Sequence, residues 1–334
     1  GAQGLKEIAN SLCKVLTLKS SQTASGVRDV VKITDLLFAS TGVIGEEFPY
    51  IKIRNRIPEA VKKLRSDQNK YIWFKTASAI MTTDTRPKLA YEECKIGNKI
   101  VKISGIAKGS GMIHPNMATM LSFIFTDANI PSAFLKVLLK KVSATTFNAI
   151  TVDSDTSTND MAVIFATNKA KNSKIYNVLD PKLQEFEKAL HRLCLNLAKQ
   201  IVVDGEGAKK FITVKIIGAK SISMAKNIGF SVANSPLVKT AIAGEDPNWG
   251  RIIMAVGKSG ENIIANKVQL KIGKYLVAEH SKQAKDYNEK LLKEYMKWGS
   301  IDIEVNLNIG TSSHTVYTCD FTHDYIDINT DYRN

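Results

Sequence analysis

Residues 108–126 read KGSGMIHPNMATMLSFIFT. Glycines and small polar side chains dominate the first half of this stretch, and an apolar segment follows directly. A short apolar run bounded by glycine and proline is typical of a buried strand, so we predict a strand over 121–126. A second strand is predicted over 99–104. The residues between them would form a loop that a rigid scaffold presents at the end of a strand.

Outward from this stretch, strand and helix patterns are interspersed along the chain. Apolar residues recur at helical spacing over 132–142 and again after Pro181, where Asp180 is a suitable N-cap. In 301–307 apolar and polar residues alternate strictly, which predicts a strand. Several strands mixed with a few long helices indicate a layered α/β sandwich of the α+β type. The remaining predicted strands cover 161–167, 211–218 and 268–272.

The net charge of +14 raises the question of a nucleic-acid partner. Only 8 of the 46 basic residues are arginine, whereas nucleic-acid sites favour arginine forks and stacked aromatic rings. We therefore interpret the charge as lysines on solvated helix faces, as in 282–297, and predict no nucleic-acid partner. An anionic substrate would also benefit from such a field.

The cysteines and the hydropathy pattern bear on the compartment. Cys13, Cys94, Cys194 and Cys319 are far apart and form no CxxC pair, so we predict four buried free thiols in a reducing cytoplasm. No apolar run approaches the roughly 18 residues of a membrane span, and charged and polar residues interrupt the N-terminal segment. We expect a cytoplasmic protein with no membrane partner.

Four segments are unlike ordinary surface or core. Each combines glycines or acidic residues with small hydroxyl or amide side chains next to an apolar element, which suits functional loops but equally suits turns and helix caps. They are STGVIG at 40–45, KGSGMIHPNMAT at 108–119, DSDTSTND at 153–160 and GEDPNWGR at 244–251.

Thr119 is the candidate nucleophile. A threonine hydroxyl needs an adjacent base near pH 7, and none of the five histidines stands in a convincing triad. Its own α-amine, with an ordinary pKa of about 7.7–8.0, can serve instead. That amine exists only after the Ala118–Thr119 bond is cut, and the small Ala118 leaves room for the threonine to attack it. From the residues alone this mechanism remains one option.

The motifs decide between these options. Six segments occur in this order between residues 40 and 333: STGVIGEEFP, AIMTTDTRPKLA, KGSGMIHPNMATML, ITVDSDTSTND, GEDPNWGR and DYIDINTDYR. Together they resemble the successive motifs of the ornithine acetyltransferases, the bifunctional glutamate N-acetyltransferase family of arginine biosynthesis. The resemblance implies that family's fold, which is related to the N-terminal-nucleophile hydrolases.

The resemblance also implies a reaction. The chain would cleave itself into an α chain, 1–118, and a β chain, 119–334, that begins with the nucleophile Thr119. N-acetylornithine would acetylate Thr119 and release ornithine, and glutamate would then take the acetyl group as N-acetylglutamate. We expect neither a metal nor a bound cofactor, with acetyl-CoA as an optional second acetyl donor. The assembly implied is an α2β2 heterotetramer.

The family's site residues map onto this chain one by one. Thr41 and Gly42 match the oxyanion hole, where a hydroxyl and a backbone amide would face the developing negative charge. Lys108 is a suitable partner for a substrate carboxylate, and Glu206 for a substrate amine. The expected substrate contacts are Thr82, Lys108, Thr119, Glu206, Asn329 and Asn334.

Other features of the resemblance concern structure. Family members usually have several dozen residues before the segment that matches Gly1, so the chain looks short at its N-terminus. Asn334 stands where the family commonly ends in Ser or Thr. Five polar residues of the acidic and tryptophan-containing motifs are expected to form a buried polar network that shapes the site or a subunit contact. These are Asp155, Asn159, Asp246, Asn248 and Arg251.

Two other functions stay open at this point. The nearest alternative is an N-terminal-nucleophile amidase or aminopeptidase, in which water takes the acyl group instead of an amino acid. A basic binding protein that kept an inactive enzyme scaffold is the alternative from a different class, and salt-sensitive binding to RNA or DNA would identify it.

Overall fold

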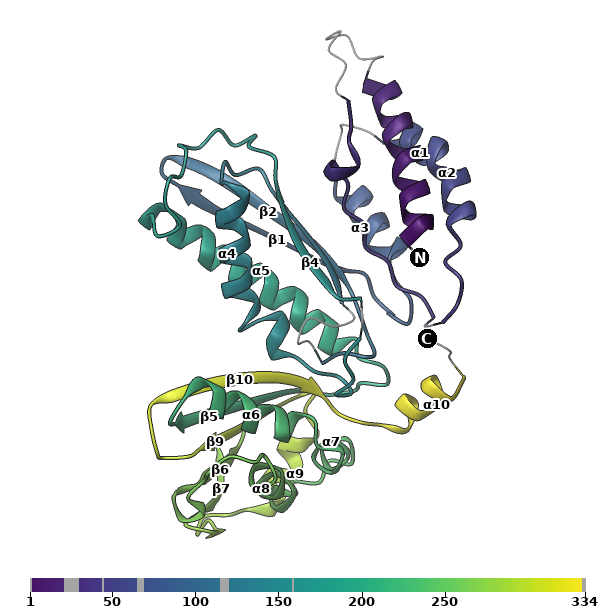
Figure 1. The fold of residues 1–334 in the computed structure, drawn as a ribbon. Coiled ribbons are helices and arrows are strands. Elements are labelled where there is room, and N and C mark those ends of the chain that lie inside the picture. The colour runs from purple at the N-terminus through teal and green to yellow at the C-terminus, as the bar shows by residue number, and fades with distance from the viewer. Residues whose placement is uncertain are drawn as a thin grey trace. The chain divides into compact units, whose positions relative to one another are not determined.

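The computed structural model describes residues 2–20, 30–43, 45–64, 69–114, 120–157 and 159–331. The chain divides into two compact units, the first coloured from purple to blue and the second from blue through teal and green to yellow in Figure 1. The first unit comprises 1–72 with 332–334, and the second comprises 73–331. Each unit has its own core, and the two are described separately.

The first unit is helical in its described part. Helices α1 (Ala2–Ser20) and α2 (Tyr50–Lys63) pack against each other, with a short 3-10 turn at Ile33–Asp35 between them in sequence. The approach is close at Gly4, where a Cβ atom would lie 2.9 Å from the Tyr50 side chain. A third helix, α3 (Lys70–Ala79), crosses the boundary between the units. The small buried core consists of Ile8, Ile57 and Val61.

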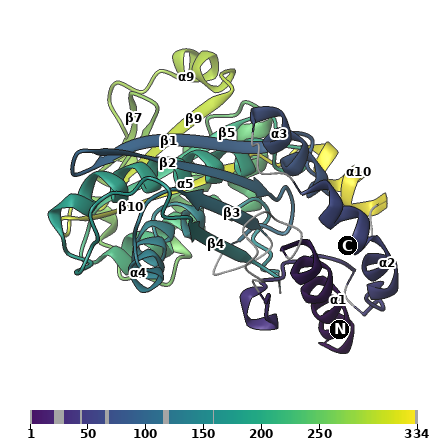
Figure 2. The same cartoon turned by 90° about the horizontal axis from the view of Figure 1, so that it is seen from above.

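The second unit contains a four-stranded sheet, β1-β2-β3-β4, whose strands are seen side by side in Figure 2. Strands β1, β2 and β3 are antiparallel neighbours, and β4 is parallel to β3. Parallel neighbours need a crossover connection, and α4 lies in the segment between β3 and β4. The bounds are β1 Lys88–Ile96, β2 Lys99–Lys108, β3 Leu121–Thr126 and β4 Met161–Ala166.

Two helices cover one face of this sheet. Helix α5 (Gln184–Val203) packs on β1 and β2, and α4 (Ser132–Ser143) packs on β4 and α5. A Cβ atom at Gly105 would lie 2.9 Å from the Leu197 side chain, so the glycine lets α5 approach the sheet closely. The leucine stripe of α5 is fully buried, which removes a long apolar surface from water.

A second, six-stranded sheet has the order β10-β5-β9-β6-β7-β8. Helix α6 packs on its strands β5 and β10, and α8 packs on α6. The strands are β5 Phe211–Ala219, β6 Gln269–Ile272, β7 Tyr275–Glu279, β8 Lys282–Gln283, β9 Ser300–Asn306 and β10 Ser312–Cys319. The helices are α6 Ile222–Ala233, α7 Pro236–Ala243, α8 Trp249–Gly257, α9 Glu289–Met296 and α10 His323–Asp331.

The segment before the DSDTSTND motif connects the two sheets of the second unit. Ile150 forms a parallel bridge with Tyr317 of β10, and the Thr151 amide donates to the Tyr317 carbonyl over 2.9 Å. The motif therefore begins at a point that is fixed by backbone hydrogen bonds to the second sheet.

The predicted fold class, a layered mixture of helices and sheets, is confirmed. The strand over 121–126 and the helix after Pro181 are confirmed as β3 and α5. Asp180 accepts a capping hydrogen bond from the Lys182 amide over 2.9 Å, but it caps the 3-10 turn Pro181–Leu183 that directly precedes α5 and not α5 itself. The other predicted strands are present with ends shifted by up to four residues. Strands β1, β7, β8 and β10 and most of the shorter helices were not predicted.

Two smaller expectations need correction. The four cysteines are free, but only Cys194 and Cys319 are buried, since Cys13 and Cys94 are partly exposed. Residues 282–297 do not form one helix: they contain β8 and the eight-residue α9. Across the described ranges, no helix combines the length and the apolar character needed to span a bilayer.

Candidate active site

The loop after β2 is held by its own backbone amides. The Gly109 amide donates to Asp84 Oδ1 over 2.7 Å. The Met112 and Ile113 amides donate to the two carboxylate oxygens of Asp153 over 2.6 and 2.9 Å. Carboxylates that accept backbone hydrogen bonds are among the stronger hydrogen-bond acceptors in proteins. Both ends of the segment 109–113 are therefore fixed to other parts of the second unit.

Lys108 and Thr82, two of the expected substrate contacts, meet at the start of this loop. Lys108 is the last residue of β2 and is 3% exposed. Its Nζ donates to Thr82 Oγ1 over 2.8 Å. Burial lowers the pKa of Lys108, and the negative charges of Asp84, Asp160 and Glu206 oppose this effect. The site is thus a buried cation surrounded by carboxyl groups.

Glu206 and Asn329 form a second pair in the same region. Glu206 is 4% exposed and its Oε2 accepts from the Asn329 Nδ2 over 2.9 Å. The Glu206 amide donates to the Ser110 carbonyl over 3.0 Å. A Cβ atom at Gly111 would overlap the Glu206 carboxylate, so this glycine is what allows the carboxylate to lie against the loop. Lys108, Glu206 and Asn329 therefore come together from β2, the segment after α5, and α10.

A buried ion triad supports the Lys108 end of the loop. Lys88 Nζ lies 2.6 Å from Asp84 Oδ1 and 2.6 Å from Asp204 Oδ2. Asp84 also accepts from the Thr82 amide over 3.1 Å, and Asp204 accepts from the amide and hydroxyl of Thr85. Burial acts to raise the pKa of Asp84, but Lys88 and the backbone amides outweigh it and hold this pKa below its ordinary value.

Sequence reasoning did not identify this triad. Its only local signal is the spacing of Asp84 and Lys88, four residues apart in MTTDTRPK. The third member, Asp204, is 116 residues further along the chain from Lys88. A contact at such a separation depends on how α5 packs on β1, which no local pattern contains.

Asp160 is a further carboxyl group at this site that the sequence did not single out. It precedes β4, and burial raises the pKa of Asp160 to about 8. The Lys108 ammonium and the Met120 amide oppose this increase, although that amide falls short of hydrogen-bond geometry with the carboxyl oxygens. Asp160 lies beside the residue that directly follows Thr119.

The remaining predicted site residues are not placed in this cluster. Thr41 and Gly42 belong to the first unit, where both are exposed, and their role as an oxyanion hole stays a prediction. Ala118, Thr119 and Asn334 lie outside the described residues. The nucleophile and the terminal substrate contact therefore also stay predictions.

The expected buried polar network is wrong, because three of its five members, Asp155, Asn159 and Asp246, are exposed. In the GEDPNWGR motif the contacts are local. The Asn248 side chain caps α8 by accepting from the Arg251 amide over 3.3 Å. The Arg251 guanidinium donates to the Leu237 carbonyl over 2.9 Å. This motif connects α7 to α8 and has a structural role.

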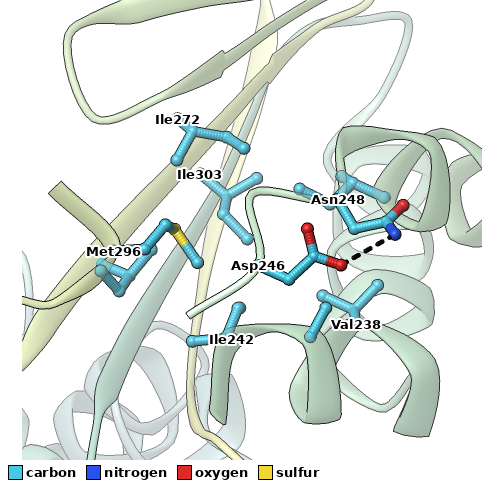
Figure 3. A pocket seen from close by; sticks show the side chains of 10 residues that line it. Val238, Ile242, Asp246, Asn248, Ile272, Met296 and Ile303 are labelled. Atoms are coloured by element: carbon cyan, nitrogen blue, oxygen red, sulfur yellow. Dashed lines mark hydrogen bonds between the residues drawn. The ribbon is translucent and has the colours of Figure 1, made fainter. Parts of the chain in front are cut away.

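The same motif borders a small apolar cavity, shown in Figure 3. At the edge of the cavity, the side-chain amide of Asn248 donates a hydrogen bond to the Asp246 carboxylate over 3.1 Å. The cavity measures about 10 Å³, which is close to the minimum for one water molecule. It is too small for an amino acid. No group of His, Cys, Asp and Glu side chains within the described ranges could hold a metal ion.

Several known proteins are similar to this chain in sequence. The model of the ArgJ family matches residues 8–334. A relative from Gluconobacter oxydans, named arginine biosynthesis bifunctional protein ArgJ, is 49% identical over 300 residues, which are 90% of this chain and 70% of that protein. A relative of the same name from Rhizobium meliloti is 45% identical over 322 residues, 96% of this chain and 76% of that protein.

A solved structure agrees with these relatives. The crystal structure of the arginine biosynthesis bifunctional protein argJ from Bacillus halodurans superimposes with a TM-score of 0.59 at 40% sequence identity. It covers 62% of this chain and 96% of that one. The match in sequence over nearly the whole chain and the match in fold lead to one conclusion: the chain belongs to the ArgJ family.

Proposed function

We propose that this protein transfers an acetyl group from N-acetylornithine to glutamate in arginine biosynthesis, through an acetyl ester on Thr119. The observation that carries the proposal is the buried pair of Lys108 and Glu206 beside the loop after β2, with the exposed Asn329 hydrogen-bonded to Glu206. Family membership and the names of the relatives support the same pathway.

The cation and the carboxylate suit the charged groups of the two substrates. N-acetylornithine and glutamate share an α-carboxylate, which one cation can hold in a common pose, and each has one free amine that a carboxylate can hold, on the side chain of N-acetylornithine and on the α-carbon of glutamate. Lys108 is assigned to the carboxylate and Glu206 to the amine. The Lys108–Thr82 hydrogen bond of 2.8 Å keeps the ammonium in place before the substrate arrives.

The chemistry requires two steps on one hydroxyl. The Thr119 oxygen first attacks the Ala118 carbonyl, the Ala118–Thr119 peptide bond breaks, and one water molecule hydrolyses the ester so formed. This gives chains 1–118 and 119–334 and frees the α-amine of Thr119 to act as a base. The threonine oxygen then attacks the acetyl carbonyl, with Thr41 and Gly42 as the oxyanion hole. Ornithine leaves, and glutamate takes the acetyl group in the reverse of these steps, without a metal or a cofactor.

We further propose acetyl-CoA as an optional acetyl donor and an α2β2 assembly of the two chains in the cytoplasm. Both follow from the family resemblance. Gel filtration of the cleaved protein tests the assembly, and acetylation of glutamate in the absence of N-acetylornithine tests the donor.

Intact mass spectrometry tests the central claim. The protein is measured before and after N-acetylornithine is added, with and without glutamate. Two chains are expected, with an acetyl increment on the chain that begins at Thr119 and loss of that increment when glutamate is present. Release of acetate at a rate that glutamate does not change would instead identify a hydrolase. An absence of any acetylated chain would contradict the proposal.

Lys108→Met is expected to weaken substrate binding. A hydrogen bond to a charged group contributes about 1.5–3 kcal/mol, which corresponds to about a 10- to 100-fold increase in KM. Because the contact exists before and during the reaction, kcat should change less than KM. Steady-state kinetics with both substrates measure this.

The matched control for this variant is Lys102→Met. Lys102 lies on the same strand, β2, but is exposed, so its KM should equal that of the unmodified protein. An equal KM in the Lys108→Met variant and in this control would contradict the assignment of Lys108 to the substrate carboxylate.

A further inference from the structure

Asp160 lies level with the start of β3. In the parallel pair β3–β4, Leu121 is opposite Met161, and the Met161 amide donates to the Met120 carbonyl over 3.0 Å. Asp160 and Met120, one residue before each strand, are therefore neighbours. The carboxyl group of Asp160 lies at the N-terminal end of β3, where the chain arrives from residue 119.

The carboxyl group has no hydrogen-bond partner among the described residues. Both of its oxygens are shielded from solvent. A buried carboxylate that lacks a partner is costly, so such a group either takes up a proton or receives a cation. The raised pKa of Asp160, about 8 because of burial, reflects this cost. An unpaired acid at this place needs an explanation in terms of the reaction.

A cavity of about 440 Å³ is bordered by the same residue. Asp160 and Met120 both line it, together with apolar side chains of β4 and α4 and the lysines Lys136 and Lys140 of α4. Lys108 of β2 is the one charged group that acts on the pKa of Asp160, and it opposes the increase that burial causes. Lys136 and Lys140 are the charged residues that line the cavity besides Asp160.

We propose that Asp160 is a positioning residue whose carboxylate accepts a hydrogen bond from the α-amino group that cleavage creates at Thr119. This inference rests on the proposed function. Thr119 is bonded to Met120, so its amino nitrogen is at most one residue length, about 3.8 Å, from the Met120 amide. That amide faces Asp160. The new ammonium supplies the missing partner.

In the transfer step, one proton then moves between the Thr119 oxygen, the α-amine and the ornithine nitrogen. The Thr119 oxygen forms its bond to the acetyl carbon, and its proton passes to the α-amine, which becomes an ammonium ion. The carboxylate of Asp160 stabilises this ion while it exists. When the bond between the acetyl carbon and the ornithine nitrogen breaks, the ammonium returns the proton to that nitrogen, and no net proton is gained or lost.

The proposal predicts a shift in the pH profile. A neighbouring carboxylate favours the charged form of an amine and raises its pKa, whereas the base must be neutral to act. Asp160→Asn removes this charge, so the α-amine pKa falls and the acid limb of kcat/KM moves to lower pH. At the same time the ammonium loses its partner, and kcat should fall by roughly 100-fold.

The experiment compares Asp160→Asn with Asp155→Asn, which removes an exposed carboxyl group from the same segment. Cleavage and acetylation are read by intact mass, and kcat/KM is measured as a function of pH. Asp160→Asn should be cleaved to completion, lose about 100-fold in kcat and show the acidic shift. Asp155→Asn should match the unmodified protein in all three measurements. Asp160→Ser, a second neutral variant, must reproduce the shift.

Three outcomes would overturn the proposal. An unchanged profile and kcat in Asp160→Asn would show that the carboxylate does not meet the amine. A lower kcat with no shift of the acid limb would show a structural role only. A permanently uncleaved Asp160→Asn chain, with Asp155→Asn cleaved, would assign Asp160 to the cleavage itself. If the unmodified protein neither cleaves nor becomes acetylated, the proposed function fails instead.

Discussion

Thr119→Ala is expected to remain a single chain of 334 residues with no transfer of acetyl groups. The substitution removes the only hydroxyl that the proposed cleavage and the proposed ester both use. Without cleavage there is no α-amine at this position, so the base is lost together with the nucleophile. Denaturing electrophoresis and intact mass measure the cleavage, and release of ornithine from N-acetylornithine measures the transfer.

The control for this variant is Thr119→Ser, which keeps a hydroxyl of similar reach. It should be cleaved and should form an acetyl adduct, at a rate set by the altered side chain. Two results would contradict the mechanism: full transferase activity in Thr119→Ala, or cleavage of that variant directly after Ala118.

Lys88→Met is expected to be the most destabilising single substitution among the described side chains around the site. Lys88 is 1% exposed and lies 2.6 Å from a carboxylate oxygen of both Asp84 and Asp204. Removing one partner of a buried ion pair leaves an uncompensated charge and typically costs about 3–5 kcal/mol. Here two carboxylates lose their cation, so the free energy of unfolding should fall by about that amount.

Urea unfolding near neutral pH measures this loss, with Lys95→Met as the matched control. Lys95 is on the same strand, β1, but is exposed, so its substitution should change the free energy of unfolding by less than about 0.5 kcal/mol. Combining Lys88→Met with Asp84→Asn and Asp204→Asn should recover part of the stability, because the buried charges are then removed together. Equal unfolding midpoints for the two methionine variants would contradict the role of the triad.

The pH dependence of the same triad has a defined sign. Because Lys88 and the backbone amides lower the pKa of Asp84 in the folded protein, its stabilising effect is present above the unfolded carboxyl pKa. It is lost as the pH falls through the lower folded value. The difference in the free energy of unfolding between the unmodified protein and Lys88→Met should therefore be largest near neutral pH and should shrink as the pH falls and the carboxyl groups take up protons. Urea unfolding at a series of pH values measures this.

Elements with a strong periodic pattern were predictable from the sequence. The leucine stripe of α5 and the short apolar run of β3 describe complete buried surfaces, so local pattern and tertiary position agree. Strand β1 was missed because Glu92 and Glu93 stand in its middle and its exposed face carries charge. Its place in the sheet depends on pairing with β2.

The site was predictable only in part. The motifs identified Lys108, Glu206 and Asn329, and the structure places them together. Asp160 and Lys88 were not identified, because an acidic or basic residue in a sequence is normally solvated. Their burial follows from strands and helices that are far apart in the chain. No local pattern encodes an unpaired carboxyl group.

The antiparallel pairing of β2 with β3 has a consequence for folding. The Ala118–Thr119 bond lies in the connection between these two strands, so the proposed cleavage removes their covalent link and leaves the six residue pairs of the ladder. A folded sheet then contains strands from two separate molecules. The unfolding of each α–β pair then includes a dissociation of its two chains, whereas Thr119→Ala keeps both strands on one molecule, so its Tm should depend less on protein concentration. Cleavage thus adds one dissociation of chains to the unfolding of every α–β pair.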